Sequence, residues 1–161
     1  FFPEFARYLF PETVITDRAI RDDRDIERRV NLAVRRGLRS DVEIYRCRAL
    51  IDETPHYKEY LTLADAFRDR NRELVLNGLF RDTVGAGCDN PGIGYSVFEA
   101  KGKTGIILTS GKTAEQAVVT VPGGRFIGVD RIREGSAKAL SPERIEVELP
   151  PDSLLLLIFE R

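Results

Sequence analysis

The chain has 161 residues, of which 42% are hydrophobic and 32% are charged, a composition typical of folded proteins rather than disordered ones. Its 25 basic and 26 acidic side chains leave a formal net charge of −1, so it lacks the positive field on which nucleic-acid binding usually depends. The only uninterrupted apolar run, residues 154–159, is far shorter than the roughly 20 residues that cross a bilayer, so neither nucleic acid nor a membrane is an expected partner.

The first half begins with a strand-like segment followed by a helical one. Residues 5–10, FARYLF, have the aromatic composition of a strand. Residues 23–38 place apolar side chains on one helical face, with aspartates before them, arginines near the end and Gly37 as a suitable stop. The face consists of Ile26, Val30, Ala33, Val34 and Gly37. Asp22, Asp23 and Asp25 could instead suggest a metal site, but neighbouring carboxylates on an emerging helix point in different directions.

A second strand and helix follow. In residues 41–46, Val42 and Ile44 share one face of a strand, and Asp41, Glu43 and Tyr45 share the other. Residues 54–76 predict a second amphipathic helix, with Thr54 as N-cap and Pro55 as first residue. Its apolar stripe consists of Tyr57, Tyr60, Leu61, Ala64, Phe67, Asn71 and Leu74. His56 lies in the first turn, where a surface or capping role is favoured over a ligand or a catalytic base.

This alternation of strand and helix predicts parallel strands covered by helices. Two such units cannot close a sheet, so we expect them to join strands that these residues do not supply. The chain also starts without Met and contains none. We interpret it as the tail of a longer protein.

From residue 77 apolar and polar residues alternate with a period of two, which is typical of strands, and turn-forming residues separate these segments. Six strands are predicted, at 93–100, 104–110, 116–121, 125–130, 144–149 and 154–160. Short strands joined by tight turns indicate an antiparallel β-sandwich. The last strand is apolar on both faces, which places it in the middle of a sheet and beside early strands of this half. The boundary falls at 77–92, where we interpret GAGCDNPG as a linker because strands, not a helix, follow it.

Motifs for catalysis or cofactor binding are absent from the sequence. Cys47 and Cys88 have no metal-ligand spacing with the single histidine, His56. We expect no cofactor and no metal. The cysteines do not determine the compartment, and we expect a soluble protein with the cytoplasm favoured.

The order of elements resembles the C-terminal part of a glycoside hydrolase with a (β/α)8 barrel and an appended β-sandwich, as in the alpha-galactosidase and amylase-like groups. The resemblance is carried by two strand–helix units, a long helix running into RELVLNGLFRDT (72–83), and a sandwich ending in LPPDSLLLLIFER (149–161). It implies that residues 1–76 have an α/β fold and form the last two units of the barrel. Residues 77–161 would form an all-β domain. Residues 5–10 would form the seventh barrel strand and residues 41–46 the eighth.

The resemblance also implies where a substrate would bind. Barrel active sites lie at the carboxyl ends of the strands. Substrate-binding candidates are Glu12, Asp17, Glu43, Tyr45 and Arg46. Glycoside cleavage needs two carboxylates, and in the resembled families these generally come from earlier strands. The catalytic residues would therefore lie outside this chain, which we expect to be inactive alone.

The predicted function is thus to complete the barrel of a glycoside hydrolase, with the rest of the barrel and a carbohydrate substrate as partners. A homo-oligomer is left open. One alternative is a carbohydrate-binding or interaction module, although the aromatic residues of the sandwich are equally explained as core. These residues are Tyr95, Phe98, Phe126 and Phe159. Another alternative is a small two-layer enzyme with a cleft between the halves, around Arg7, Asp17, Glu43 and His56.

Overall fold

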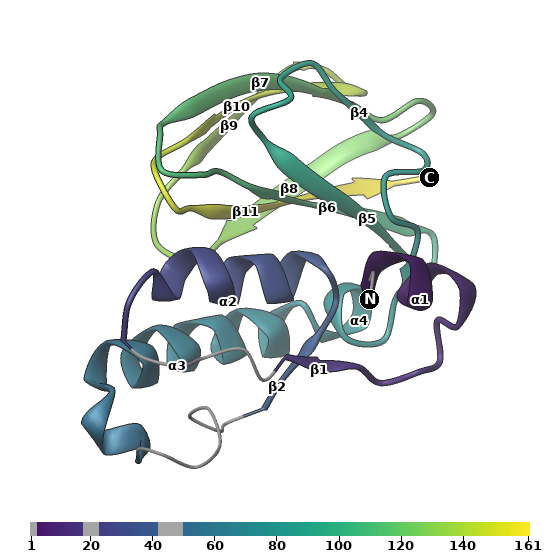
Figure 1. Ribbon diagram of the computed structural model, residues 1–161. Helices are drawn as coiled ribbons and strands as arrows, with labels where there is room; N and C mark the ends of the chain where they lie inside the picture. Colours follow the sequence, from purple (N-terminus) through teal and green to yellow (C-terminus); the bar gives the residue numbers. More distant parts are fainter. Residues whose placement is uncertain (1–2, 18–22, 42–49) are drawn as a thin grey trace.

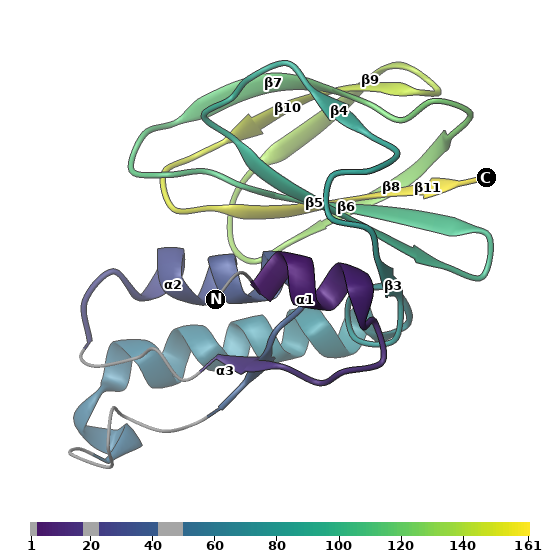
Figure 2. The ribbon, with the colours of Figure 1, turned by 45° about the vertical axis from the view of Figure 1, so that its right-hand side comes forward.

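The protein combines helices with mostly antiparallel sheets. The structure, a computed structural model, describes residues 3–17, 23–41 and 50–161. Helices form one layer, a five-stranded sheet lies against them, and a four-stranded sheet covers its other face (Figures 1 and 2). In the part of the chain described, no helix has the length and apolar character that a bilayer crossing requires.

The first element is a helix, α1 (Pro3–Leu9), so the predicted strand at residues 5–10 is wrong. Pro3 suits the first helical position, and Glu4 in the first turn and Arg7 in the last complement the helix dipole. Arg7 is buried, and its Nη1 donates to the carbonyl oxygens of Pro11 at 2.9 Å and Thr13 at 3.0 Å. These contacts fix the chain reversal after α1. They outweigh the strand preference of the aromatic residues.

A short parallel strand pair follows α1. β1 (Thr16–Asp17) pairs with β2 (Arg39–Ser40), with Thr16 opposite Arg39 and Asp17 opposite Ser40. Helix α2 (Ile26–Arg35) connects the two strands, and a 3₁₀ turn (Ile51–Glu53), α3 (Pro55–Arg70) and α4 (Arg72–Val75) come after them. Most of the predicted second strand, residues 42–46, lies outside the described residues. The order is therefore helix, strand, helix, strand, helix, with the first strand later than predicted.

Helix α2 ends at the glycine that the sequence indicates. Gly37 has φ of +68°, and its N–H donates to the carbonyl of Val34 at 2.9 Å. The N–H of Leu38 donates to the carbonyl of Ala33 at 2.9 Å, which completes a Schellman motif. The apolar side chains of the predicted face, Ile26, Val30, Ala33 and Val34, are buried as expected.

Helix α3 begins at Pro55, but its capping differs from the prediction. Thr54 occupies the N-cap position, yet its hydroxyl donates to the carbonyl of Ile51 at 3.1 Å. The carboxylate of Asp23 accepts instead from the backbone N–H groups of His56 at 3.1 Å and Tyr57 at 2.7 Å. The cap thus comes from the segment before α2 and joins the starts of both helices. The predicted stripe is buried at Tyr57, Tyr60, Leu61, Ala64 and Phe67 in α3 and at Leu74 in α4.

All six predicted strands are present in the two antiparallel sheets. They are β5 (Gly94–Ala100), β6 (Lys103–Thr109), β7 (Glu115–Thr120), β8 (Arg125–Arg131), β10 (Arg144–Leu149) and β11 (Leu154–Glu160). Three further strands were not predicted, namely β3 (Leu79–Phe80), β4 (Gly87–Cys88) and β9 (Ser136–Ser141). The sheet orders are β3-β5-β6-β11-β8 and β4-β7-β10-β9. Because β4 pairs with β7, Gly87 and Cys88 within the predicted linker belong to a sheet.

Strand β11 lies inside its sheet, between β6 and β8, as its double-sided apolar pattern predicts. Leu154 and Leu156 belong to a cluster shared with α2, α3 and α4, whereas Leu155, Leu157 and Phe159 belong to a second cluster between the two sheets. Strand β11 is therefore packed on both faces of the sheet. The first cluster also shows that helices and sheet share one core, while the division into domains at residue 76 stays a prediction.

Candidate functional site

Two of the five predicted substrate-binding residues, Glu12 and Asp17, lie in the described part of the chain, and only Asp17 stands at the carboxyl end of a strand. Glu12 is exposed in the turn between α1 and β1. Asp17 is the last residue of β1 and is half-buried. Glu43, Tyr45 and Arg46 lie outside the described residues. The structure thus brings Asp17 to a strand end and places Glu12 on the connection before it.

The surroundings of Asp17 are polar and belong mainly to the helix layer. A small pocket there is lined by Asp17, Val30, Ala33, Ser40, Tyr57, Leu61 and Arg68. Arg68 is buried, and its Nη1 donates to Ser40 Oγ at 2.7 Å and to Asp65 Oδ1 at 2.8 Å. Its Nη2 donates to the carbonyl of Leu38 at 3.1 Å. Arg68 therefore ties α3 to the start of β2, and Asp17 lies on the side of the strand pair that faces the helices.

Burial governs the titration of this cluster. It raises the pKa of Tyr57 to about 12, with the negative charge of Asp17 adding to the effect. Burial also lowers the pKa of Arg68, and the carboxylate of Asp65 opposes that change. A neutral phenol and a paired guanidinium at neutral pH suit an architectural role better than proton transfer.

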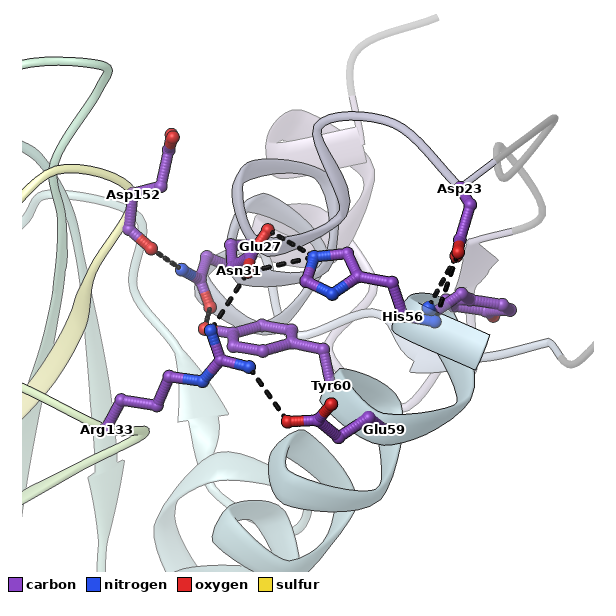
Figure 3. A network of polar contacts seen from close by, with 9 residues as sticks. Asp23, Glu27, Asn31, His56, Glu59, Tyr60, Arg133 and Asp152 are labelled. Carbon is purple, nitrogen blue, oxygen red and sulfur yellow. Dashed lines mark hydrogen bonds and ion pairs between the residues drawn. The ribbon is translucent and has the colours of Figure 1, made fainter. Parts of the chain in front are cut away.

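A second polar cluster lies where α2 and α3 meet the turns of the sheets, and sequence reasoning did not find it (Figure 3). Arg133, in the β8–β9 turn, donates to Glu27 at 3.0 Å and to Glu59 at 3.2 Å. Its guanidinium lies 4.9 Å from the ring centroid of Tyr60. A ring nitrogen of His56 lies 3.0 Å from Glu27. One turn is thus fixed to both helices by charge pairs and a cation–π contact.

A buried chain of hydrogen bonds continues this cluster. The hydroxyl of Tyr60 donates to Asn31 Oδ1 at 2.8 Å, and Asn31 Nδ2 donates to the carbonyl of Asp152 at 2.8 Å (Figure 3). Burial raises the pKa of Tyr60 to about 12. For Glu27, burial alone would raise the pKa, but His56 and Arg133 outweigh it and hold the pKa below its usual value. Glu27 is therefore an ionised acceptor and a poor proton donor.

The favoured interpretation of His56 as a surface residue agrees with its position. Its side chain is partly exposed and pairs with Glu27. Among the described residues, no group of three or more His, Cys, Asp or Glu side chains is arranged to hold a metal ion. Asp23 caps α3, as described above, and Asp22 lies outside the described residues. The aromatic residues considered for a binding face are in the core: Phe98 and Phe159 are fully buried, and Tyr95 and Phe126 pack against the inter-sheet cluster.

Comparison with solved structures finds a similar fold in a glycoside hydrolase. The chain matches a family 30 endoxylanase from Clostridium papyrosolvens C71 with a TM-score of 0.56 and 11% identity, over 91% of this chain and 41% of that one. A family 30 subfamily 8 xylanase from Clostridium acetobutylicum matches with a TM-score of 0.37 and 13% identity, over 45% of this chain and 21% of that one, which is too weak to carry an argument. No protein-family model matches the sequence. No curated protein matches it either.

The fold of this chain is thus similar to part of a family 30 glycoside hydrolase. The chain spans less than half the length of either xylanase, and at this identity the similarity concerns the fold alone. The finer likeness to the alpha-galactosidase and amylase-like groups stays a prediction.

Proposed function

We propose that the chain is the C-terminal part of a barrel glycoside hydrolase, in which residues 1–76 complete the barrel and residues 77–161 form a stabilising β-sandwich. The observation that carries this proposal is the fold similarity to a family 30 endoxylanase, which extends over 91% of the chain. The similarity includes helices as well as sheets, so it is not explained by a common sandwich alone.

The arrangement of the first half supports the proposal. β1 and β2 are parallel, and each is followed by a helix, which is the repeating unit of a barrel. The sheet that they form contains two strands among the described residues. A parallel pair of this size is not stable alone, so further strands on its edges are expected.

Exposed apolar side chains in α1 and in the segment that leads to β1 give independent support. We call these residues, Phe5, Leu9, Phe10 and Val14, the α1 patch. Phe5 is 66% exposed, Phe10 is 55% exposed and Val14 is 61% exposed. Large apolar side chains exposed close together in the sequence are expected to contact another part of the protein when they share a surface. The remaining strands and helices of the barrel, in the same or a separate polypeptide, are the occupant that fits the proposal.

The proposal assigns catalysis to that remainder. Two carboxylates placed across a glycosidic bond are required, and we assign both to earlier barrel strands. Glu12, Asp17, Glu43, Tyr45 and Arg46 would shape the substrate site at the barrel rim through hydrogen bonds and stacking. The isolated chain is therefore expected to show no glycosidase activity, and the complete protein requires no cofactor.

The mass and activity of the natural polypeptide test this proposal. Peptides of this chain are expected in a species heavier than 18.2 kDa that hydrolyses xylan or another polysaccharide. Deleting residues 77–161 from that species should leave it insoluble or lower its melting temperature. A natural product of only 18.2 kDa, or a deletion with normal melting, would contradict the proposal.

The α1 patch offers a test on the isolated chain. The double variant Phe5→Glu and Phe10→Glu should abolish self-association and the binding of a hydrophobic dye without lowering the melting temperature, because both side chains are exposed. Leu140→Glu is the matched control, since Leu140 is exposed on β9. A monodisperse wild-type monomer that binds no dye would argue against a covering partner.

A further inference from the structure

A cavity of about 380 Å³ lies beside the second polar cluster, where the β8–β9 and β10–β11 turns meet α2 and α3. We call it the junction pocket. Its volume falls within the range of small-molecule sites. It is lined by Glu27, Tyr60, Ile132, Arg133, Glu134, Pro150, Pro151, Asp152 and Ser153.

The lining of the junction pocket combines opposite charges with an apolar wall. Glu27, Glu134 and Asp152 supply carboxylates, and Arg133 supplies a guanidinium. An excess of carboxylates disfavours an anion, and a cation would leave the donors of Arg133 unused. A neutral molecule with many hydroxyl groups can donate to the carboxylates and accept from the guanidinium. Ile132 and the rings of the two prolines can contact its carbon atoms.

One carboxylate oxygen of Asp152 lacks a hydrogen-bond donor among the described residues. Its Oδ1 is buried and has no hydrogen-bond partner within the described part of the chain. The main chain at Asp152 is fixed, because its N–H donates to the carbonyl of Gly111 at 2.7 Å and its carbonyl accepts from Asn31 at 2.8 Å. A buried acceptor without a donor costs about 1–3 kcal/mol, so a shift of this carboxylate toward a donor in the junction pocket would recover free energy.

Arg133 is held in place before any ligand arrives. Glu27 and Glu59 fix its guanidinium over the ring of Tyr60, as Figure 3 shows. Its backbone has φ of +80°, a conformation that few residues other than glycine adopt. The turn is therefore kept in shape by these contacts, and the side of the pocket that it forms requires little ordering when a ligand binds.

We propose that the junction pocket binds a short neutral saccharide. A neutral polyhydroxylated ligand can use the carboxylates, the guanidinium and the apolar wall together. The site is separate from the strand ends at which Asp17 lies, and it is built by α2, α3 and two turns of the sheets. The inference therefore does not depend on the proposed barrel function and can fail or succeed independently of it.

Titration of the folded 161-residue chain with xylotriose and maltotriose, followed by NMR or calorimetry, tests the proposal. We expect millimolar binding of a neutral trisaccharide and weaker binding of glucuronate and lysine. Glu134→Ala should weaken saccharide binding about tenfold, which is the loss of one hydrogen bond to a charged group. Asp152→Asn should weaken it about fivefold, because the amide is a weaker acceptor and asparagine tolerates the same backbone.

Glu146→Ala is the matched control, because Glu146 is exposed on β10 and does not line the pocket. Unchanged melting temperatures show that each variant is folded. The proposal is overturned if no neutral saccharide binds at millimolar concentration, or if binding is unaffected by both pocket variants. Stronger binding of glucuronate or lysine would equally refute the charge argument.

Discussion

Leu156 and Leu157 are neighbours in β11, both fully buried, yet they pack into different clusters. Leu156 faces the helices, and Leu157 faces the four-stranded sheet. Replacing either with alanine removes the same atoms and leaves a cavity, which costs about 2–5 kcal/mol in well-packed cores. If helices and sheets share one core, both variants should destabilise the whole chain by similar amounts.

Urea unfolding measures this directly. With a slope of about 2 kcal/mol per molar urea, a loss of about 3 kcal/mol lowers the midpoint by about 1.5 M. Far-UV circular dichroism reports the backbone of all elements, and near-UV circular dichroism includes the buried rings of Tyr57 and Tyr60 in α3. The two signals should change together in the wild type and in both variants.

Two results would refute this reasoning. In one, Leu156→Ala shifts the near-UV transition and leaves the far-UV transition of the strands unchanged, so that helices and sheets unfold separately. In the other, Leu156→Ala costs much less than Leu157→Ala, so that the helix-facing cluster is loosely packed. Leu140→Ala is the control for a side chain that is 47% exposed, and we expect it to cost less than about 0.5 kcal/mol.

Two further predictions concern the helix layer. Gly37→Ala should lower the free energy of unfolding more than Gly102→Ala. Both glycines have positive φ, which costs alanine about 1–2 kcal/mol. A Cβ at Gly37 would also lie 3.2 Å from Phe98, whereas a Cβ at Gly102 would contact nothing within 4 Å. Equal losses in thermal unfolding would show that the crowding at Gly37 is relieved without cost. Ionised Glu27 should contribute up to about 1 kcal/mol of stability above pH of about 4.3, its unfolded pKa, and the contribution should vanish as the pH falls through the lower folded pKa. The difference in unfolding free energy between wild type and Glu27→Gln should therefore shrink on acidification, and a difference that grows at low pH would contradict the assigned direction of the pKa.

The strands of the second half could be predicted because their signals are local. Alternating burial and turn residues determine where β7 and β10 begin and end, and the double-sided apolar pattern of β11 correctly indicates a central position. β9 was missed because SAKALS has few strand-forming residues and is mostly exposed. β3 and β4 are two residues long, which is too short for any periodic pattern.

The errors in the first half have a tertiary origin. α1 has aromatic residues typical of a strand, but its helix is supported by Arg7, whose guanidinium donates to the following turn and lies over the ring of Phe80. The second polar cluster was missed for a related reason. Glu27 and Arg133 are 106 residues apart in sequence, and Asn31 and Asp152 are 121 apart. No spacing rule connects residues at such separations, so the sequence alone gives no signal that these side chains meet.

The position of the helix layer bears on how the sheets could influence a substrate site. α2 and α3 contact the five-stranded sheet through the helix-facing cluster, and Arg68 of α3 holds Ser40 and the carbonyl of Leu38 beside the strand pair. The helices thus have the sheet on one side and β1 and β2 on the other. Packed interiors transmit displacement because they contain little free volume. In a completed barrel, the sheets would therefore fix the strand ends at which Asp17 lies, so the proposed sandwich would act on substrate geometry as well as on stability.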